Sequence, residues 1–335
     1  MKTTWIPITK LLPTLKVDKG RDFTVPYGEY DKNDPEDMRL LSMVPARLKQ
    51  YRYPPALLLK VLAGIHFRGS ALIYGPTGTG KSLFWMMLAS LLNMPFTRFQ
   101  CDGDLGHPEM VGYLGVPIKG LMRKVKKSDG TVEEIPDDGY KFPLLVRAIQ
   151  HPGIVILDEW DSCQAEGAAC LQTLCENVRP GLQLIEIAEF INKDENCFIG
   201  ATDNSRGMGD PEGLYASVQM QNYAQLCRFT QLLELPALEQ KSVIKVLQSM
   251  RVDGKKLESD RIKAFADLYE MARAANLTTD LSVPLNLRML QQLAEISALL
   301  GADALESVIL NKMPMEKDMA ALHGMAVQLD LVKDN

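Results

Sequence analysis

Gly75-Pro76-Thr77-Gly78-Thr79-Gly80-Lys81-Ser82 is the stretch that decides how this chain is built. It matches the pattern G-x-x-x-x-G-K-[ST], follows the short apolar segment SALIYG (70–75) and opens the apolar segment KSLFWMMLASLLN (81–93). Glycines let such a loop wrap around phosphate without Cβ clashes, and the free N–H groups at the start of the helix then point at the anion. The alternative, a chance glycine-rich turn, is disfavoured by the strand before the loop and the helix after it.

The loop predicts a binding site for ATP with Mg²⁺. We expect Lys81 to reach the β- and γ-phosphates and the Ser82 hydroxyl to bind the metal ion. The residues expected to contact the nucleotide are Gly75, Pro76, Thr77, Gly78, Thr79, Gly80, Lys81, Ser82, Leu83 and, from a later helix, Arg288.

A second segment supplies two acids. Val155-Ile156-Leu157 carries a buried strand to Asp158 and Glu159. We expect Asp158 to lie beside Mg²⁺ with Ser82, and Glu159 to polarise the attacking water. An acid pair that merely ends a strand in solvent is the alternative. A glutamate suited to activating water favours hydrolysis over phosphoryl transfer to a substrate.

Three further polar residues are candidates for the site. Asn204 ends the apolar strand CFIGATDN and can orient the lytic water, although an asparagine also simply ends strands. Arg228 lies where a helix meets the last core strand, and in a ring it would act as an arginine finger toward a neighbouring subunit; a surface salt bridge is the alternative. Arg288 could touch ATP from the C-terminal region, or be a solvated helical arginine.

Apolar segments alternate between strand-like and helix-like patterns along the middle of the chain. The strand-like segments are SALIYG (70–75), PFTRFQC (95–101), GIVILDEW (153–160), CFIGATDN (197–204) and RFTQLLELP (228–236). This alternation predicts an α/β fold whose parallel sheet is covered on both faces.

The same patterns divide the chain into three regions. Residues 1–50 contain several prolines and predict an extended arm with one short helix. Residues 51–236 predict the α/β nucleotide-binding core, with hairpins inserted at about 115–140 and 181–196. Residues 237–335 lose the strand pattern and carry four amphipathic segments, which predict an all-α lid domain.

Composition narrows the class of protein. The chain has 335 residues, of which 46% are apolar, and a net charge of −5 that disfavours a general binder of nucleic acid or anionic membranes. Its six cysteines have no zinc-type spacing, which favours reduced thiols in a reducing cytosol. No apolar signal core and no run of 18 apolar residues occurs, so we expect a cytoplasmic protein without a membrane span.

The first insertion carries a cluster of basic residues. A solvated hairpin with two differently charged faces is one interpretation, because acidic residues follow the basic ones. A pore-facing element that grips a partner or an anionic chain is the other. The basic residues are Lys119, Arg123, Lys124, Lys126 and Lys127, and the acids are Asp129, Glu133, Glu134, Asp137 and Asp138.

The ordered set GPTGTGKS, VILDEWD, GATDN and RF resembles the AAA+ ATPases. The two insertions look like those of the helix-2-insert branch, which includes the MoxR ATPases and chelatase motor subunits. The segments MVGYLG and ATDNSRGMGDPEGLYASVQMQNYAQLCRF resemble the CobS-type subunit of cobaltochelatase. The resemblance extends over roughly residues 55–250. It implies an AAA+ core with strand order 5-1-4-3-2.

The resemblance also implies function and partners. It implies a homo-hexameric ring that hydrolyses ATP with Mg²⁺ at its subunit interfaces, and a partner with a von Willebrand A (CobT-like) domain. It assigns catalytic roles to Lys81, Glu159, Asn204 and Arg228. Three positions depart from the usual pattern: Asp203 precedes Asn204, Cys227 precedes Arg228, and Leu285 rather than an arginine follows Pro284.

The resemblance leaves three kinds of client open. The first is a tetrapyrrole chelatase, and the second is another protein activated by a MoxR-like chaperone. The third is nucleic acid, moved by a motor that uses the basic hairpin 119–127; the acidic net charge disfavours it.

Overall fold

The structure of the chain is a computed structural model. It describes residues 1–13, 22–48, 50–102, 110–117, 119, 122–126, 131–136, 139–163, 168–169, 171–176, 178–209, 218, 220–278 and 280–332. These residues form two compact units: Met1–Tyr74 with Lys81–Glu234, and Gly75–Gly80 with Leu235–Asn335.

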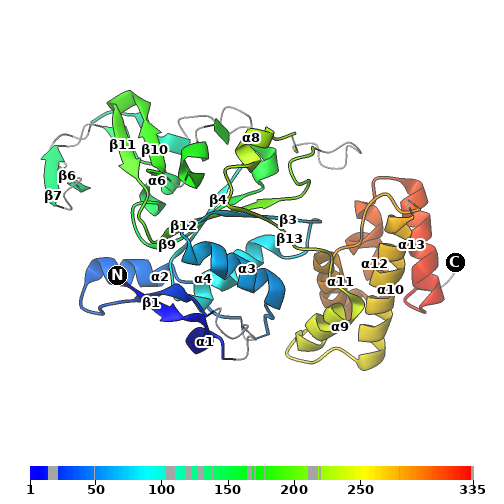
Figure 1. The fold of residues 1–335 in the computed structure, drawn as a ribbon. Coiled ribbons are helices and arrows are strands. Elements are labelled where there is room, and N and C mark those ends of the chain that lie inside the picture. The colour runs from blue at the N-terminus through cyan, green and yellow to red at the C-terminus, as the bar shows by residue number, and fades with distance from the viewer. Residues whose placement is uncertain are drawn as a thin grey trace. The chain divides into compact units, whose positions relative to one another are not determined.

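The centre of the first unit is a five-stranded parallel sheet (Figure 1). Its strands lie in the order β13-β3-β12-β9-β4, which confirms the predicted order 5-1-4-3-2. The strands are β3 (Ala71–Tyr74), β4 (Phe96–Gln100), β9 (Gly153–Asp158), β12 (Cys197–Asp203) and β13 (Gln231–Glu234).

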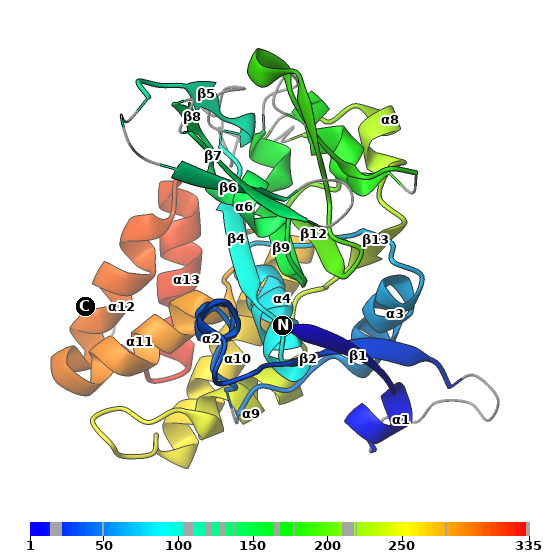
Figure 2. The same cartoon turned by 90° about the vertical axis from the view of Figure 1, so that its left-hand side faces the viewer.

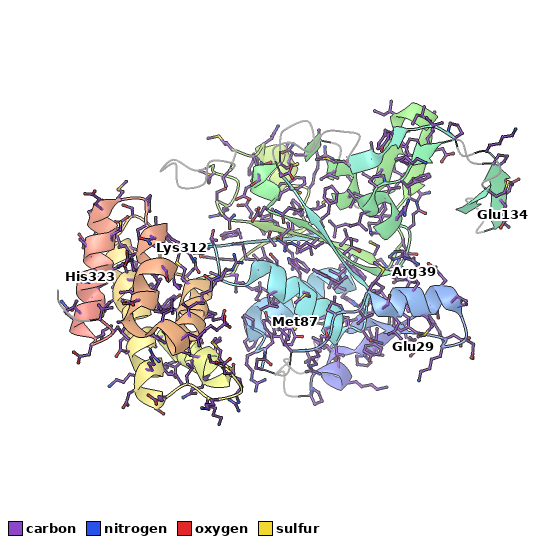
Figure 3. The ribbon with its side chains drawn as sticks, turned by 180° about the vertical axis from the view of Figure 1, so that it is seen from behind. Glu29, Arg39, Met87, Glu134, Lys312 and His323 are labelled. Carbon is purple, nitrogen blue, oxygen red and sulfur yellow. The ribbon has the colours of Figure 1, made fainter. Side chains whose placement is uncertain are left out.

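The central strands are apolar because both faces of the sheet are covered. Every residue of β9 and of β12 is buried. Helices α3 (Pro55–His66) and α4 (Lys81–Leu91) lie on one face, and α6 (Leu144–Ala148) lies on the other (Figure 1). Figure 3 labels Met87, a fully buried residue of α4.

A glycine lets α4 approach the sheet closely. A Cβ atom added to Gly200 of β12 would lie 2.7 Å from the ring of Trp85, so only glycine fits there. Trp85 Nε1 also donates to the carbonyl oxygen of Ala201 at 3.3 Å. This packing fixes the helix that begins at Lys81 against the strand that ends at Asp203.

The N-terminal region differs from the extended arm that the prolines suggest. β1 (Lys2–Pro7) and β2 (Thr24–Glu29) pair antiparallel, and α1 (Ile8–Leu11) and α2 (Pro35–Ser42) follow them in turn (Figure 2). Proline is tolerated here because a two-stranded sheet consists only of edges and because Pro35 occupies the first turn of a helix, where its missing N–H costs nothing.

Both predicted hairpins are present. In the first insertion, β6 (Met122–Lys126) pairs with β7 (Val132–Pro136), and β5 (Tyr113–Leu114) pairs with β8 (Tyr140–Lys141). Glu134, labelled in Figure 3, lies on β7. In the second, β10 (Gly181–Leu184) pairs with β11 (Glu189–Asn192). Residues 127–130, between β6 and β7, lie outside the described residues.

Short helices connect these strands. They are the 3-10 helices η1 (Trp160–Ser162), η2 (Gln172–Cys175) and η3 (Ile185–Ile187), and the α-helix α8 (Tyr223–Leu226).

The second unit consists mainly of helices from Gln240 onward. Its helices are α9 (Gln240–Ser249), α10 (Ser259–Leu277), α11 (Leu287–Leu300), α12 (Ala304–Val308) and α13 (Glu316–Gln328), with short η4 (Gly301–Asp303) and η5 (Leu310–Lys312). They enclose an apolar core that includes Phe265, Leu290 and Leu322. Helix α13, which carries the labelled His323 in Figure 3, is additional to the four predicted segments. Among the described residues, no helix is long and apolar enough to cross a membrane.

Candidate nucleotide site

The glycine-rich loop has a backbone that only glycine adopts readily. Gly75, Gly78 and Gly80 have φ values of 150°, 78° and 92°. A Cβ atom on Gly78 would lie 2.7 Å from the side chain of Asn286, and one on Gly75 would overlap the carbonyl oxygen of Leu235. The loop therefore keeps a turned backbone with no side chains at these three positions, which fits the close approach of a phosphate group.

Lys81 is the first residue of α4 and is only 8% exposed. Its Nζ atom donates to Oδ1 of Asn204 at 2.8 Å. Burial lowers the pKa of Lys81 to about 8, and the nearby negative charges oppose that shift. These charges belong, in order of effect, to Asp161, Asp203, Asp158 and Glu159. A largely desolvated ammonium group at a helix start is suited to an anionic ligand.

The Ser82 hydroxyl donates to Asp158, at 2.7 Å to Oδ1 and 3.0 Å to Oδ2. Asp158 is 1% exposed and also accepts from the Thr202 hydroxyl. Arg98 Nε lies 2.5 Å from Asp158 Oδ2. A hydroxyl and a carboxylate side by side are hard oxygen donors of the kind that Mg²⁺ prefers. The residues present therefore fit a magnesium–nucleotide complex.

Glu159 is held in the left-handed region of the backbone, at φ 56° and ψ 49°. Its backbone N–H donates to Thr202 Oγ1 at 2.9 Å, and its Oε2 accepts from Gln100 Nε2 at 2.6 Å. A non-glycine residue in this region is strained and persists only where its surroundings hold it. The polar residues of β4 and β12 on either side supply those bonds.

Asn204 follows the last residue of β12. Its side chain accepts from Lys81, and its backbone N–H donates to Asp161 Oδ2 at 2.7 Å. The next N–H, from Ser205, donates to Asp203 Oδ1 at 2.6 Å. Two buried acids thus fix the turn that carries this amide.

The two candidate arginines lie in different surroundings. Arg228 forms an ion pair with Glu176 of the same chain, and its side chain is 36% exposed. This ion pair is a salt bridge of the kind that the sequence left open as the alternative to an arginine finger. Arg288 is exposed on the first turn of α11. Leu83 is partly buried on α4.

The basic hairpin is described mainly through its backbone. Arg123, Lys124 and Lys126 belong to β6, whereas Lys127 lies outside the described residues, as do Asp129, Asp137 and Asp138.

Sequence reasoning missed several partners at this edge of the sheet. Gln100, Arg98 and Thr202 contact the two strand-end acids, and Asp161 contacts Asn204. The parallel register of β4 and β9 could have pointed to some of these partners, because it pairs Gln100 with Asp158 and Arg98 with Ile156. A polar residue near the end of the strand next to β9 was therefore a candidate.

Comparisons with known proteins show what the chain is similar to. Residues 70–204 match the family described as AAA domain (dynein-related subfamily). Over 309 residues the chain is 26% identical to "Aerobic cobaltochelatase subunit CobS" of Sinorhizobium sp, a match that covers 91% of this chain and 86% of that protein. Over 108 residues it is 31% identical to "Denitrification regulatory protein NirQ" of Stutzerimonas stutzeri, covering 32% of this chain and 33% of that protein.

One solved structure that the chain matches in part is "Closed State CryoEM Reconstruction of Hsp104:ATPyS and FITC casein". The TM-score is 0.44 and the sequence identity 15%, and the match covers 72% of this chain and 42% of that chain.

Proposed function

The chain belongs to the AAA+ proteins of the CobS/MoxR type, and from that premise we propose that it hydrolyses ATP with Mg²⁺ in an oligomeric ring and thereby remodels a partner protein. The observation that carries the proposal is the contact between Ser82 and Asp158 at 2.7 Å. It brings the end of the glycine-rich loop to the acid that ends β9.

The residues divide into those that hold the nucleotide and those that act on water. The glycine loop and Lys81 bind the phosphates, and Ser82 with Asp158 holds Mg²⁺. The metal ion, when bound, supplies positive charge that neutralises the phosphate oxygens. Glu159 accepts a proton from the attacking water, and Asn204 orients that water after its amide releases Lys81.

Ring assembly gives Arg228 its proposed role. A subunit interface would draw its guanidinium away from Glu176 toward the neighbouring nucleotide, where it stabilises charge in the transition state. The pair is only partly buried, which supports the proposal because a salt bridge that is open to solvent costs less to exchange for another partner than a buried one. Arg288 is proposed as a contact to the nucleotide from α11.

The proposal about the partner rests on the resemblance to the CobS and MoxR proteins. CobS is named as a subunit of aerobic cobaltochelatase and NirQ as a denitrification regulatory protein. We propose that this chain drives a second protein carrying a von Willebrand A domain, the partner that its sequence resemblance implies, in a chelatase or in another complex activated in the MoxR manner. We place this activity in the cytoplasm.

A single substitution tests the activity. Glu159→Gln should lower turnover by about 10²–10³-fold while ATP binding persists, because it removes the proposed base and keeps the shape of the side chain. Glu195→Gln, an exposed glutamate that pairs with Arg68, is the matched control and should change neither. Wild-type protein without Mg²⁺-dependent phosphate release, or unchanged turnover in Glu159→Gln, would refute the assignment.

The same variant serves to find the partner. With ATP bound and turnover blocked, Glu159→Gln should retain the assembled ring on an affinity resin, and mass spectrometry of the retained proteins identifies the client. Recovery of a protein with a von Willebrand A domain supports the proposal. Recovery of nucleic acid with ATPase stimulation by it would favour the motor alternative instead.

A further inference from the structure

Two carboxyl groups lie completely inside the protein behind the proposed site. Asp161, in η1, and Asp203, the last residue of β12, are both 0% exposed. Asp161 Oδ2 accepts the N–H of Asn204, and Asp203 Oδ1 accepts the N–H of Ser205. The two acids therefore accept hydrogen bonds from two successive backbone N–H groups in the turn that carries the Asn204 side chain.

Each acid also has one oxygen that lacks a hydrogen-bond partner. Within the described part of the chain, Asp161 Oδ1 and Asp203 Oδ2 are buried and accept nothing. A buried carboxylate oxygen without a donor is costly, and two like charges at one site oppose each other's ionisation. A single proton relieves both problems, because it turns one orphan oxygen into a donor and halves the charge of the pair.

Asp161 is the better place for that proton. Burial and the charge of Asp203 raise the pKa of Asp161 to about 6. Burial raises the pKa of Asp203 as well, but the N–H groups of Ser205, Arg206 and Gly207 stabilise its ionised form. A proton on Asp161 Oδ1 leaves Oδ2 free to accept from Asn204, as observed.

We propose that Asp161 and Asp203 form a buried acid pair that positions Asn204 and takes up a proton onto Asp161 when a nucleotide phosphate approaches Lys81. The inference rests on the proposed function of the same site. The pair adds positioning residues and a proton-linked step to that function, and both acids act through Asn204 and Lys81 without touching the nucleotide.

The charges around the pair explain why nucleotide binding and protonation are linked. Lys81 on α4 faces Asp161 and Asp203, and the other charges near it are Asp158 and Glu159 at the end of β9. Without nucleotide, the ammonium helps to keep Asp161 ionised. Phosphate oxygens neutralise Lys81 and bring further negative charge, so the proton affinity of Asp161 rises on binding.

Isothermal titration calorimetry measures this proton directly. ATP is titrated into the full-length chain with EDTA at pH 6.5, where no Mg²⁺-dependent hydrolysis occurs, in two buffers of different ionisation enthalpy. The difference in observed heat gives the protons taken up per nucleotide. We expect wild type to take up about half a proton more than Asp161→Asn. The matched control, Asp194→Asn, replaces an acid just before β12 and should match wild type.

Turnover separates positioning from a purely structural role. Asp161→Asn keeps the acceptor for Asn204 and should therefore turn over ATP faster than Asp161→Ala. Asp161→Ala loses it and should lower kcat about tenfold at an unchanged KM, the effect of one lost hydrogen bond to a positioned group. Equal proton uptake in wild type and Asp161→Asn, with binding intact in both, would overturn the inference.

A measurement on wild type covers the case in which a variant does not fold. Infrared difference spectra between nucleotide-free and ATP-bound protein should show a new C=O band of a protonated carboxyl group; absence of that band contradicts the proposal. The proposed function is tested apart from it, because wild-type hydrolysis with Mg²⁺ and no proton uptake refutes only the acid pair, whereas no hydrolysis refutes the function.

Discussion

Ser82 and Asp158 are 76 positions apart in the chain, and the serine hydroxyl nevertheless donates to both oxygens of the aspartate. The contact joins the start of α4 to the end of β9 inside one compact unit. The hydroxyl and carboxylate oxygens that the proposed magnesium site requires therefore already lie together.

The first prediction concerns metal dependence. Ser82→Ala removes one proposed ligand of Mg²⁺ and should weaken the binding of ATP with Mg²⁺ about tenfold, while ATP binding in EDTA changes little. Fluorescent-nucleotide titrations with and without the metal check it. Equal weakening in both titrations would show that the hydroxyl serves the phosphates and not a metal ion. Ser90→Ala, further along α4, is the control.

The second prediction concerns Lys81 and stability. Its folded pKa, about 8, is below the ordinary 10.5, so the penalty for its charge develops as pH falls from 10.5 and is complete below about 8. Lys81→Met should therefore lose nucleotide binding. Its free energy of unfolding at pH 7 should nevertheless be about 1–3 kcal/mol higher than that of wild type. Urea titrations at pH 7 and pH 10 measure this gain, which should shrink at the higher pH. A less stable variant at pH 7 would contradict the prediction.

The third prediction concerns Asp161 and stability. Its folded pKa of about 6 is above the ordinary 3.8, so the native state loses stability as pH rises between these values. The free energy of unfolding of Asp161→Asn, measured relative to that of wild type, should therefore rise by about 2 kcal/mol from pH 4 to pH 7. Denaturant unfolding at both pH values provides the measurement. A constant difference would show that the acid titrates normally in the folded chain.

The fourth prediction concerns the bond between Gln100 and Glu159. Gln100 Nε2 occupies Oε2 of Glu159, an oxygen that could otherwise accept the proton of the attacking water, so Gln100→Leu should raise basal kcat about threefold with little change in KM. Steady-state phosphate release measures both constants, and Gln183→Leu on the β10–β11 hairpin is the control. A fall in kcat would mean that Gln100 positions Glu159 and does not restrain it.

The fifth prediction concerns Arg228 and Glu176. Arg228→Ala should abolish ring turnover, and mixed rings that supply Arg228 from a neighbouring Glu159→Gln subunit should regain part of it. Glu176→Gln releases the arginine from its partner and should retain turnover. ATPase assays over a range of mixing ratios test complementation. No recovery at any ratio, with both variants folded, would return Arg228 to the role of a surface ion pair.

The sequence by itself determined the core fold and the family that the chain resembles. The strand–loop–helix at Gly75–Ser82 and the fully apolar approach to Asp158 dictate a parallel sheet, because only strands covered on both faces tolerate such runs. The strand order and both inserted hairpins are as expected. Local patterns fail where context decides. The prolines of the N-terminal region argued against strands, but a two-stranded sheet tolerates them, and β1 pairs with β2. Helix α13 lies beyond the last amphipathic segment that was predicted.

Only the tertiary structure decided which polar groups meet. Sequence spacing gives no information on side-chain contacts between β4, η1 and β12, whereas burial at the sheet edge forces each polar atom there to find a partner or a proton. Gln100 on Glu159, Asp161 on Asn204 and Lys81 on Asn204 are all contacts of this kind. The sequence therefore determined the candidate chemistry, and folding decided which neighbours tune it, because hydrogen bonds and charge interactions act over a few ångströms in space and are independent of distance along the chain.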